Sequence, residues 1–245
     1  MTKNYGELKA LFEKIKELGY VKAHRKGDTG IGKTFEDLLG KEEDNLAAPD
    51  FKDIEIKSQR EATSSMITLF TKSPDYPAKA NTYLRENFGN ISPEYNGMKI
   101  LHTTINAVKY NSHISGNDFK ICIDYDLKRL VLTIRDHATK DIVYNNAYWT
   151  FDNIEKKLKT KLKYIAYVKA DEKIENGQTF FKYTDINLIT GLTLNNFLEA
   201  LENGDVMVDI RIGVYNSGKS KGKTHDHGTG FRITLYNLMK YATII

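Results

Sequence analysis

Cysteine is almost absent from this sequence, whose 245 residues include a single one, Cys122. One thiol excludes an internal disulfide framework and a zinc site built from several thiolates. No apolar run is long enough to span a bilayer, and the charged N-terminal stretch, residues 1–20, lacks the apolar core of a signal peptide. These absences predict a cytoplasmic protein in a reducing compartment, with no membrane partner.

A strong excess of one charge is also lacking. The formal net charge is +4 and the isoelectric point is near 8.8, values that decide little about partners by themselves. Positive charge is nevertheless concentrated in AHRKG, residues 23–27, and in KSKGK, residues 219–223. Both segments suit the phosphate backbone of a nucleic acid, and both are equally compatible with solvated loops.

Apolar periodicity predicts an alternation of helices and strands, with no repeat or low-complexity linker between domains. Helices are expected over residues 5–19, 80–89, 151–162 and 192–204, the last of them ended by Gly204. Strands are expected over residues 51–59, 66–73, 119–126, 129–136, 143–150, 163–171 and 178–186, and a long hairpin over residues 205–235. This mixture predicts an α/β fold of the mixed α+β kind.

Residues 27–34, GDTGIGKT, match the phosphate-binding pattern G-x-x-x-x-G-K-[ST] letter for letter. That motif requires a buried strand immediately before it, and the preceding YVKAHRK is too polar to form one. Thr34 is expected to cap a short helix, because Asp37 completes an S/T-x-x-D/E pattern. Two other interpretations are a glycine-rich turn before this helix and a DNA-contacting loop to which Lys26 and Lys33 contribute charge.

The stretch PDFKDIEIK, residues 49–57, spaces two acidic residues and a lysine as a cation site would. Side chains alternate along a strand, so Glu55 and Lys57 are expected on one face and the neighbouring isoleucines on the buried face. A bend after the proline can bring Asp50 beside Glu55, where a divalent cation relieves the repulsion between the two carboxylates. Mg²⁺ accepts two carboxylates and a backbone carbonyl, here that of Ile56, and keeps water in its other positions.

In this interpretation Lys57 orients the attacking water or stabilises transition-state charge. Glu36, on the short helix, is a candidate further ligand or water-positioning group. An ordinary amphipathic strand is the alternative, because glutamate and lysine often alternate on a solvated strand face.

The last predicted hairpin carries side chains that suit the reading of DNA bases. A β-ribbon can enter the major groove, where arginine and histidine donate to guanine and aspartate accepts from cytosine. If the turn is extended, its three lysines align along the phosphates. The candidate DNA-contacting residues are Asp209, Arg211, Lys219, Lys221, Lys223, His225, Asp226, His227 and Arg232. The alternatives are a metal site formed by the two histidines and a solvated basic turn.

Taken together, GDTGIGKTFEDLL, PDF, DIEIK, LFTKSP, KLKYIA, VDIRIG and KGKTHDHGT resemble the MvaI/BcnI family of type II restriction endonucleases. This family lies in the MutH-like branch of the PD-(D/E)xK nucleases. The resemblance extends from near residue 25 to near residue 235 and implies a mixed sheet flanked by helices, in two lobes around a DNA-binding cleft. We expect one nuclease unit, residues 1–245, with a catalytic lobe over 1–170 and a DNA-recognition lobe over 171–245.

The resemblance also implies roles for these residues. Asp50, Glu55 and Lys57 match the catalytic triad of the family, Glu36 matches an auxiliary acidic residue, and the base-reading region matches Asp209, Arg211, His225, His227 and Arg232. The family uses Mg²⁺, for which Mn²⁺ is expected to substitute.

The implied substrate is duplex DNA with a CC-N-GG-type sequence, CCWGG being favoured, cut by a monomer that nicks each strand in turn. A cognate DNA methyltransferase is the expected functional partner, and a prokaryotic cytoplasm the expected location. The alternatives are a P-loop NTPase and a non-catalytic DNA-binding or repair accessory protein.

Overall fold

The computed structural model describes residues 2–40, 48–61, 64–226 and 228–245, in two compact units. Unit 1 comprises Met1–Ile67, Lys157–Thr193 and Leu238–Ile245, and unit 2 comprises Thr68–Lys156 and Leu194–Asn237. This differs from the expected contiguous division at residue 170. A boundary there would cut a long strand, β10 (Tyr164–Glu175), and separate its end from the strand that pairs with it, β11 (Gln178–Thr190).

Unit 1 is built on a mixed sheet with the strand order β1-β11-β10-β2. The two short strands β1 (Val21–Lys22) and β15 (Thr243–Ile244) pair antiparallel with β11. At the other edge, β2 (Ile54–Arg60) runs parallel to β10. The predicted mixed sheet is therefore confirmed, and the strand that carries the acidic motif is at its edge.

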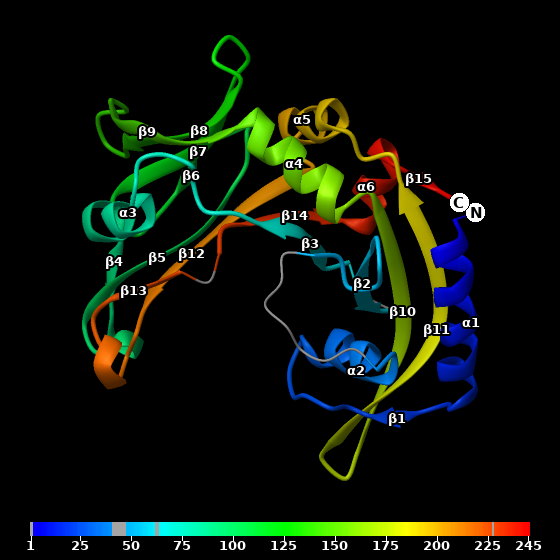
Figure 1. The fold of residues 1–245 in the computed structure, drawn as a ribbon. Coiled ribbons are helices and arrows are strands. Elements are labelled where there is room, and N and C mark those ends of the chain that lie inside the picture. The colour runs from blue at the N-terminus through cyan, green and yellow to red at the C-terminus, as the bar shows by residue number, and fades with distance from the viewer. Residues whose placement is uncertain (1, 41–47, 62–63, 227) are drawn as a thin grey trace. The chain divides into compact units, whose positions relative to one another are not determined.

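Two helices pack on the apolar face of this sheet, and Figure 1 shows α1 (Lys3–Glu17) along β11 and α2 (Gly30–Leu38) beside β2. Helix α1 places Leu8, Phe12 and Ile15 at helical spacing in the core. The ring centroids of Phe12 and Phe35 are 6.2 Å apart, and those of Phe35 and Tyr183 are 5.0 Å apart. Full burial of an aromatic ring of this kind is worth ~1.5–3 kcal/mol, so these contacts fix both helices on one face of the sheet.

Unit 2 contains two sheets. The first has the order β3-β14-β12-β5-β4, with β13 also paired to β12, and the second has the order β6-β7-β8-β9. Their strands are β3 (Met66–Thr71), β4 (Asn90–Ser92), β5 (Met98–Ile105), β6 (Asn111–Ser112), β7 (Asn117–Asp124), β8 (Arg129–Asp136), β9 (Ile142–Thr150), β12 (Val206–Val214), β13 (Thr224–Asp226) and β14 (Gly230–Thr234).

The helices α3 (Ala80–Phe88), α4 (Phe151–Lys161) and α5 (Leu194–Glu202) lie close to the bounds that the sequence predicts. A further helix, α6 (Leu235–Tyr241), follows the predicted hairpin and was not expected, and there are 3-10 turns at η1 (Pro93–Tyr95) and η2 (Gly218–Ser220). Helix α4 begins in unit 2 and ends in unit 1. No helix in the described part of the chain is long and apolar enough to cross a membrane.

The core of unit 2 is centred on Phe231. Its ring centroid lies 4.8 Å from that of Phe70, 5.8 Å from that of Phe197 and 5.7 Å from that of Trp149. Strands β7 and β8 form the predicted antiparallel hairpin.

A buried carboxylate holds the end of that hairpin. Asp118, 1% exposed, accepts hydrogen bonds from Ser112, Arg135, His137 and Lys140. Burial alone raises the pKa of Asp118, but these four donors outweigh burial and hold it far below its ordinary value.

Candidate active site

Strand β2 presents the two ionisable residues of the motif on one face. Ile54 and Ile56 are buried in the core of unit 1, and the alternate residues Glu55 and Lys57 turn to the other face, as the strand period predicts. The Lys57 ammonium donates a 2.7 Å hydrogen bond to Glu55 Oε1. The parallel register sets Glu55 opposite Ile165 and Lys57 opposite Tyr167 of β10.

A tight reversal brings Asp50 back to the same strand. Phe51 and Ile54 exchange backbone hydrogen bonds of 2.9 and 2.8 Å, and Lys52 between them adopts a left-handed φ of 54°. Beyond this reversal, Asp50 Oδ2 accepts a 2.9 Å hydrogen bond from the backbone N–H of Ile56. The predicted bend is therefore present, and it places the Asp50 carboxylate beside the strand segment that carries Glu55.

Glu55 is a buried carboxylate, 2% exposed. Burial raises the pKa of its carboxyl, Lys57 lowers it, the nearby Asp50 charge raises it again and Lys161 lowers it, with a net upward shift. Glu55 Oε1 carries the contacts to both lysines. Glu55 Oε2 is buried and accepts no hydrogen bond from the described residues.

These residues fit a divalent cation with few protein ligands. An unpartnered buried oxygen is costly, by ~1–3 kcal/mol, and a cation bound to it removes that cost. Among the described residues, no group of three or more histidine, cysteine, aspartate or glutamate side chains could hold a metal. Two carboxylates with a backbone carbonyl and water are ligands that Mg²⁺ accepts, whereas Ca²⁺ takes more protein oxygens.

Glu36 lies on α2. It lines a surface pocket of ≈ 260 Å³ together with Lys33, Ser58 and other residues at the start of α2. Ser58 is the residue of β2 that follows Lys57. The structure therefore brings Asp50, Glu55 and Lys57 together and places Glu36 in a pocket that the next residue of the same strand also lines.

Two residues of the site carry no signal in the sequence. Lys161, the last residue of α4, lies with its Nζ 3.4 Å from Glu55 Oε1. Tyr167 donates a 2.6 Å hydrogen bond to Gln59 Oε1, and the amide of Gln59 donates to the Ser65 carbonyl at 2.6 Å. Nothing in the sequence distinguishes Lys161 from the other lysines of its helix, because its role depends on the pairing of β10 with β2.

The segment that matches the phosphate-binding pattern does not have the structure of that motif. The strand before it, β1, has two residues and is antiparallel to its neighbour. Lys33 is engaged in an ion pair of 2.7 Å with Asp37. The backbone also approaches itself closely, since a Cβ on Gly30 would lie 2.3 Å from the Arg25 carbonyl oxygen. This segment is a glycine-dependent turn before a helix, with Lys26 exposed in it.

The predicted capping role of Thr34 is wrong. Helix α2 begins at Gly30, with Thr29 at its N-cap position, so Thr34 lies inside the helix. Its hydroxyl donates to the Gly30 carbonyl at 2.7 Å and accepts from the backbone N–H of His24 at 2.9 Å. The glycines allow the helix to begin one turn earlier than the capping pattern indicates.

Strand β12 in unit 2 carries a polar face opposite a buried apolar face, as the sequence predicts. Asp209 and Arg211 lie opposite Thr104 and His102 of β5, respectively. Asp209 accepts hydrogen bonds from Arg232 at 3.1 Å and from Thr104 at 2.8 Å. Arg211 Nε lies 3.7 Å from Asp209, and its guanidinium donates to the Gly228 carbonyl.

Burial lowers the pKa of His102, Asp209 raises it and Arg211 lowers it, which favours the neutral imidazole.

The turn after β12 does not have the extended conformation that would align its three lysines. Lys219, Lys221 and Lys223 are exposed, but the chain folds through η2 and a turn closed by backbone hydrogen bonds between Tyr215 and residues 222 and 223. The three lysines therefore do not align on one strand face. Gly218 and Gly222, with positive φ, produce this compact turn instead.

The two residues that follow the turn have different surroundings. The His225 ring stacks on that of Tyr215 at 4.3 Å between centroids. The Asp226 carboxylate accepts hydrogen bonds from Ser73, Asn81 and the backbone N–H of Gly228. Asp226 is thus occupied within unit 2. His227 lies outside the described residues.

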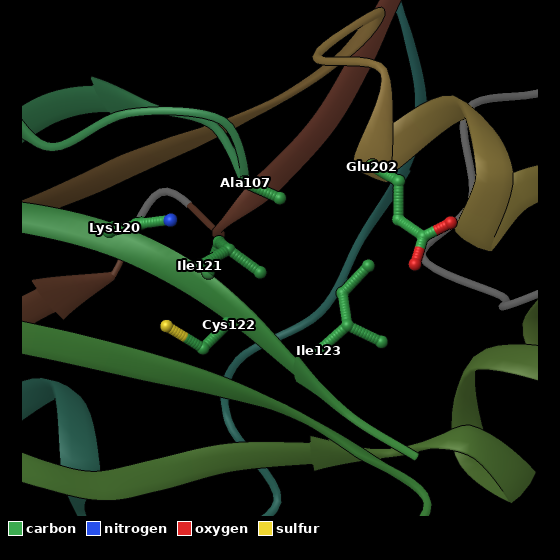
Figure 2. Close-up of a pocket in the computed structure, with 6 residues that line it drawn as sticks. All are labelled: Ala107, Lys120, Ile121, Cys122, Ile123 and Glu202. Atoms are coloured by element: carbon green, nitrogen blue, oxygen red, sulfur yellow. The ribbon is translucent and has the colours of Figure 1, made fainter.

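A second pocket, in unit 2, has a volume of ≈ 390 Å³ (Figure 2). It is lined by Ala107, Lys120, Ile121, Cys122, Ile123 and Glu202. Figure 2 shows Lys120 and the Glu202 carboxylate at opposite ends of it, and the carboxylate accepts a hydrogen bond from Tyr125. No nucleophile and base are paired among its lining residues, so the acidic site of unit 1 remains the candidate active site.

Similarity to known proteins extends over nearly the whole chain. No curated protein matches the chain. A solved structure described as a restriction endonuclease MvaI–cognate DNA substrate complex is 48% identical, with a TM-score of 0.92, and the match covers 100% of this chain and 98% of that chain. Restriction endonuclease MvaI in the absence of DNA is 47% identical, with a TM-score of 0.67 and the same coverage. A model of the MvaI/BcnI restriction endonuclease family matches residues 9–240, nearly the whole length. The chain therefore belongs to the MvaI/BcnI restriction endonuclease family.

Proposed function

We propose that this restriction endonuclease hydrolyses both strands of duplex DNA at a CC-N-GG-type sequence, CCWGG in particular, in a Mg²⁺-dependent reaction. Water attacks the scissile phosphorus in line, and the products carry a 5′-phosphate and a 3′-hydroxyl. The observation that carries the proposal is the buried Glu55 Oε2 beside Asp50 and Lys57, which accepts no hydrogen bond from any residue that the structure describes. A buried carboxylate oxygen in this state suits a metal ligand, since an ordinary structural carboxylate would accept a hydrogen bond.

Each residue at the site has a distinct proposed task. A divalent ion supplies Lewis-acid activation of water and neutralises phosphoryl charge when it is bound. Asp50, Glu55 and the Ile56 carbonyl would hold that ion, with Mn²⁺ as a substitute for Mg²⁺. The Lys57 ammonium orients the attacking water and stabilises the charge that develops on the phosphate. Glu36 acts from α2 as an outer, water-positioning group.

The polar face of β12 and the turn that follows it would recognise DNA. Arg211, Arg232, His225 and His227 read base edges, and Asp209 accepts from cytosine or orients the two arginines. The lysines Lys26, Lys33, Lys219, Lys221 and Lys223 contact phosphates and position the protein without reading sequence. Asp226 maintains the shape of the loop that presents His225, because its own acceptors are already engaged.

The remaining features of the proposal concern how the enzyme works in a cell. It acts as a monomer that nicks one strand and then the other. A cognate DNA methyltransferase protects the host sequence, and both act in a prokaryotic cytoplasm.

A plasmid digestion tests the function directly. Incubation with Mg²⁺ should give discrete fragments, and sequencing of their ends should place every break within a CC-N-GG sequence. Synthetic duplexes with A·T or G·C at the central position then test the preference for CCWGG. Ends scattered over unrelated sequences would contradict the proposed specificity.

Substitutions then separate cutting from binding. Glu55→Ala and Lys57→Ala should abolish cleavage and retain binding to the specific duplex. Arg211→Ala and His225→Ala should weaken specific binding by ~1–3 kcal/mol per lost base contact, with little change in binding to unrelated DNA. A protein that binds the specific duplex but never cuts it in Mg²⁺ or Mn²⁺ would be the non-catalytic alternative.

A further inference from the structure

Lys161 reaches the active centre from a part of the chain that the sequence motif does not include. Its ammonium lies 3.4 Å from Glu55 Oε1, the same oxygen that Lys57 contacts at 2.7 Å. The Lys161 side chain is 26% exposed and that of Lys57 20%, so both are partly buried against a carboxylate that is 3% exposed. A surface ion pair needs only one ammonium group for its carboxylate, whereas this carboxylate oxygen contacts two.

The fold explains why this lysine is in place. Leu158 and Leu162 are buried and anchor the last turn of α4. Strand β10 begins at Tyr164, and the next residue, Ile165, lies directly opposite Glu55 in the parallel pair. Lys161 therefore ends its helix four residues before the strand position that lies against Glu55. The location of Lys161 follows from packing and register, not from a chance surface encounter.

The charges around Glu55 show what Lys161 contributes. Asp50 and Glu55 carry two negative charges, and Lys57 alone would balance only one of them. Lys57 is also proposed to act on the attacking water or the phosphate. Its ammonium therefore cannot neutralise Glu55 at the same time. Lys161 has no proposed role other than its contact with Glu55. That contact is to Oε1, which stays available when a metal binds at Oε2.

We infer that Lys161 is a positioning residue of the nuclease centre. It holds Glu55 Oε1 so that Oε2 faces the metal site, and it balances the second carboxylate charge so that Lys57 is released toward the water and the DNA phosphate. This inference rests on the proposed function, since it assigns Lys161 a role in the same phosphodiester hydrolysis.

The inference predicts how DNA binding depends on metal. Without a divalent ion, the two carboxylates and two lysines cancel in charge, and a DNA phosphate can approach. Removal of the Lys161 charge leaves one net negative charge that repels the phosphate. A bound divalent ion adds two positive charges, so the centre then carries +2 in wild type and +1 in the variant. Both centres attract the phosphate, which the ion itself also neutralises, so the loss of affinity should be smaller when the ion is supplied. A lysine that merely contacted the DNA backbone would lose its contribution under both conditions.

The test compares Lys161→Ala with Lys161→Arg and with Lys159→Ala. Lys159 is exposed and lies in the same last helical turn, so its removal has a matched effect on the helix dipole. The measurements are the single-turnover cleavage rate in saturating Mg²⁺ and the dissociation constant of the specific duplex, in EDTA and in Ca²⁺. A thermal unfolding scan verifies that each variant is folded.

We expect Lys161→Ala to cleave about tenfold more slowly or worse. Its dissociation constant should rise ~3- to 10-fold in EDTA, as expected for one unit charge near a phosphate in water, and return to within about twofold of wild type in Ca²⁺. Lys161→Arg should retain both properties, and Lys159→Ala should match wild type.

The inference is overturned if Lys161→Ala behaves as Lys159→Ala does, or if it loses affinity equally in EDTA and in Ca²⁺. In either case the active wild-type enzyme would leave the proposed nuclease function intact. If wild type itself neither cuts nor binds the specific duplex, the proposed function and this inference both fail.

Discussion

The substitution Glu55→Gln should abolish cleavage and, at the same time, tighten metal-free binding to specific DNA. Glutamine keeps the size of the side chain and removes its charge. The four ionisable groups at the centre then change from a balanced set to one with a net positive charge, contributed by Lys57 and Lys161. The net positive charge of the variant site attracts a DNA phosphate, whereas the wild-type site is neutral overall.

The magnitude follows from Coulomb's law. Two unit charges ~4 Å apart interact by ~1 kcal/mol in water and by ~4 kcal/mol at the effective dielectric of a protein surface. Because the site must remain open to DNA, the lower figure applies, and it corresponds to about fivefold tighter binding. The effect should fall as salt is raised, since the interaction is screened over about 10 Å at 0.1 M ionic strength.

Fluorescence anisotropy with a labelled specific duplex in EDTA measures this change, and a plasmid assay in Mg²⁺ measures cleavage. The control is Glu13→Gln, which removes the same charge from the exposed face of α1. Unchanged or weaker metal-free binding by a folded Glu55→Gln protein would refute the charge argument. Residual cleavage near the wild-type rate would refute the assignment of Glu55 as a metal ligand.

Three further predictions test other parts of the structure. Tyr167→Phe leaves the buried Gln59 carbonyl without its donor and should lower the free energy of unfolding by ~1–3 kcal/mol, measured by urea denaturation, with an unchanged midpoint as the contrary result. Asp118→Asn should lower stability by about 2 kcal/mol at pH 7. Because the folded-state pKa of Asp118 is depressed, its contribution is complete above the unfolded-state value, 3.8, and is lost as the pH falls below it, so wild type and variant should converge in acid. A stability difference that persisted there would contradict the role of the ionised form. Lys33→Ala should leave nucleotide titrations as they are in wild type, with no heat of binding for ATP and Mg²⁺, because Lys33 is paired with Asp37; measurable ATP binding by wild type would revive the NTPase alternative.

Local periodicity allowed much of the catalytic strand to be predicted. The alternation of Ile54, Glu55, Ile56 and Lys57 requires only that the segment be extended with one face buried, since side-chain direction in a strand is a property of the backbone itself. The same reasoning located Asp209 and Arg211 on one face of β12. The family resemblance is likewise a property of the residues in order.

Three-dimensional packing decided what local patterns could not. Lys161 and Tyr167 meet the motif because β10, more than 100 residues later, pairs in parallel with β2. No local signal encodes that register, which depends on how two distant apolar faces pack together. Likewise, the glycines around α2 allow the helix to begin before Thr34, which the capping pattern had placed at its start.

The sequence by itself determined which residues carry charge and which face of each strand they occupy, because covalent geometry and alternation fix both. Only the tertiary structure decided which charges share an oxygen, that Glu55 Oε2 has no hydrogen-bond partner among the described residues and that the Asp226 carboxylate is engaged inside unit 2. The physical reason is that a hydrogen bond or an ion pair acts over a few ångströms in space, and chain distance does not specify that separation.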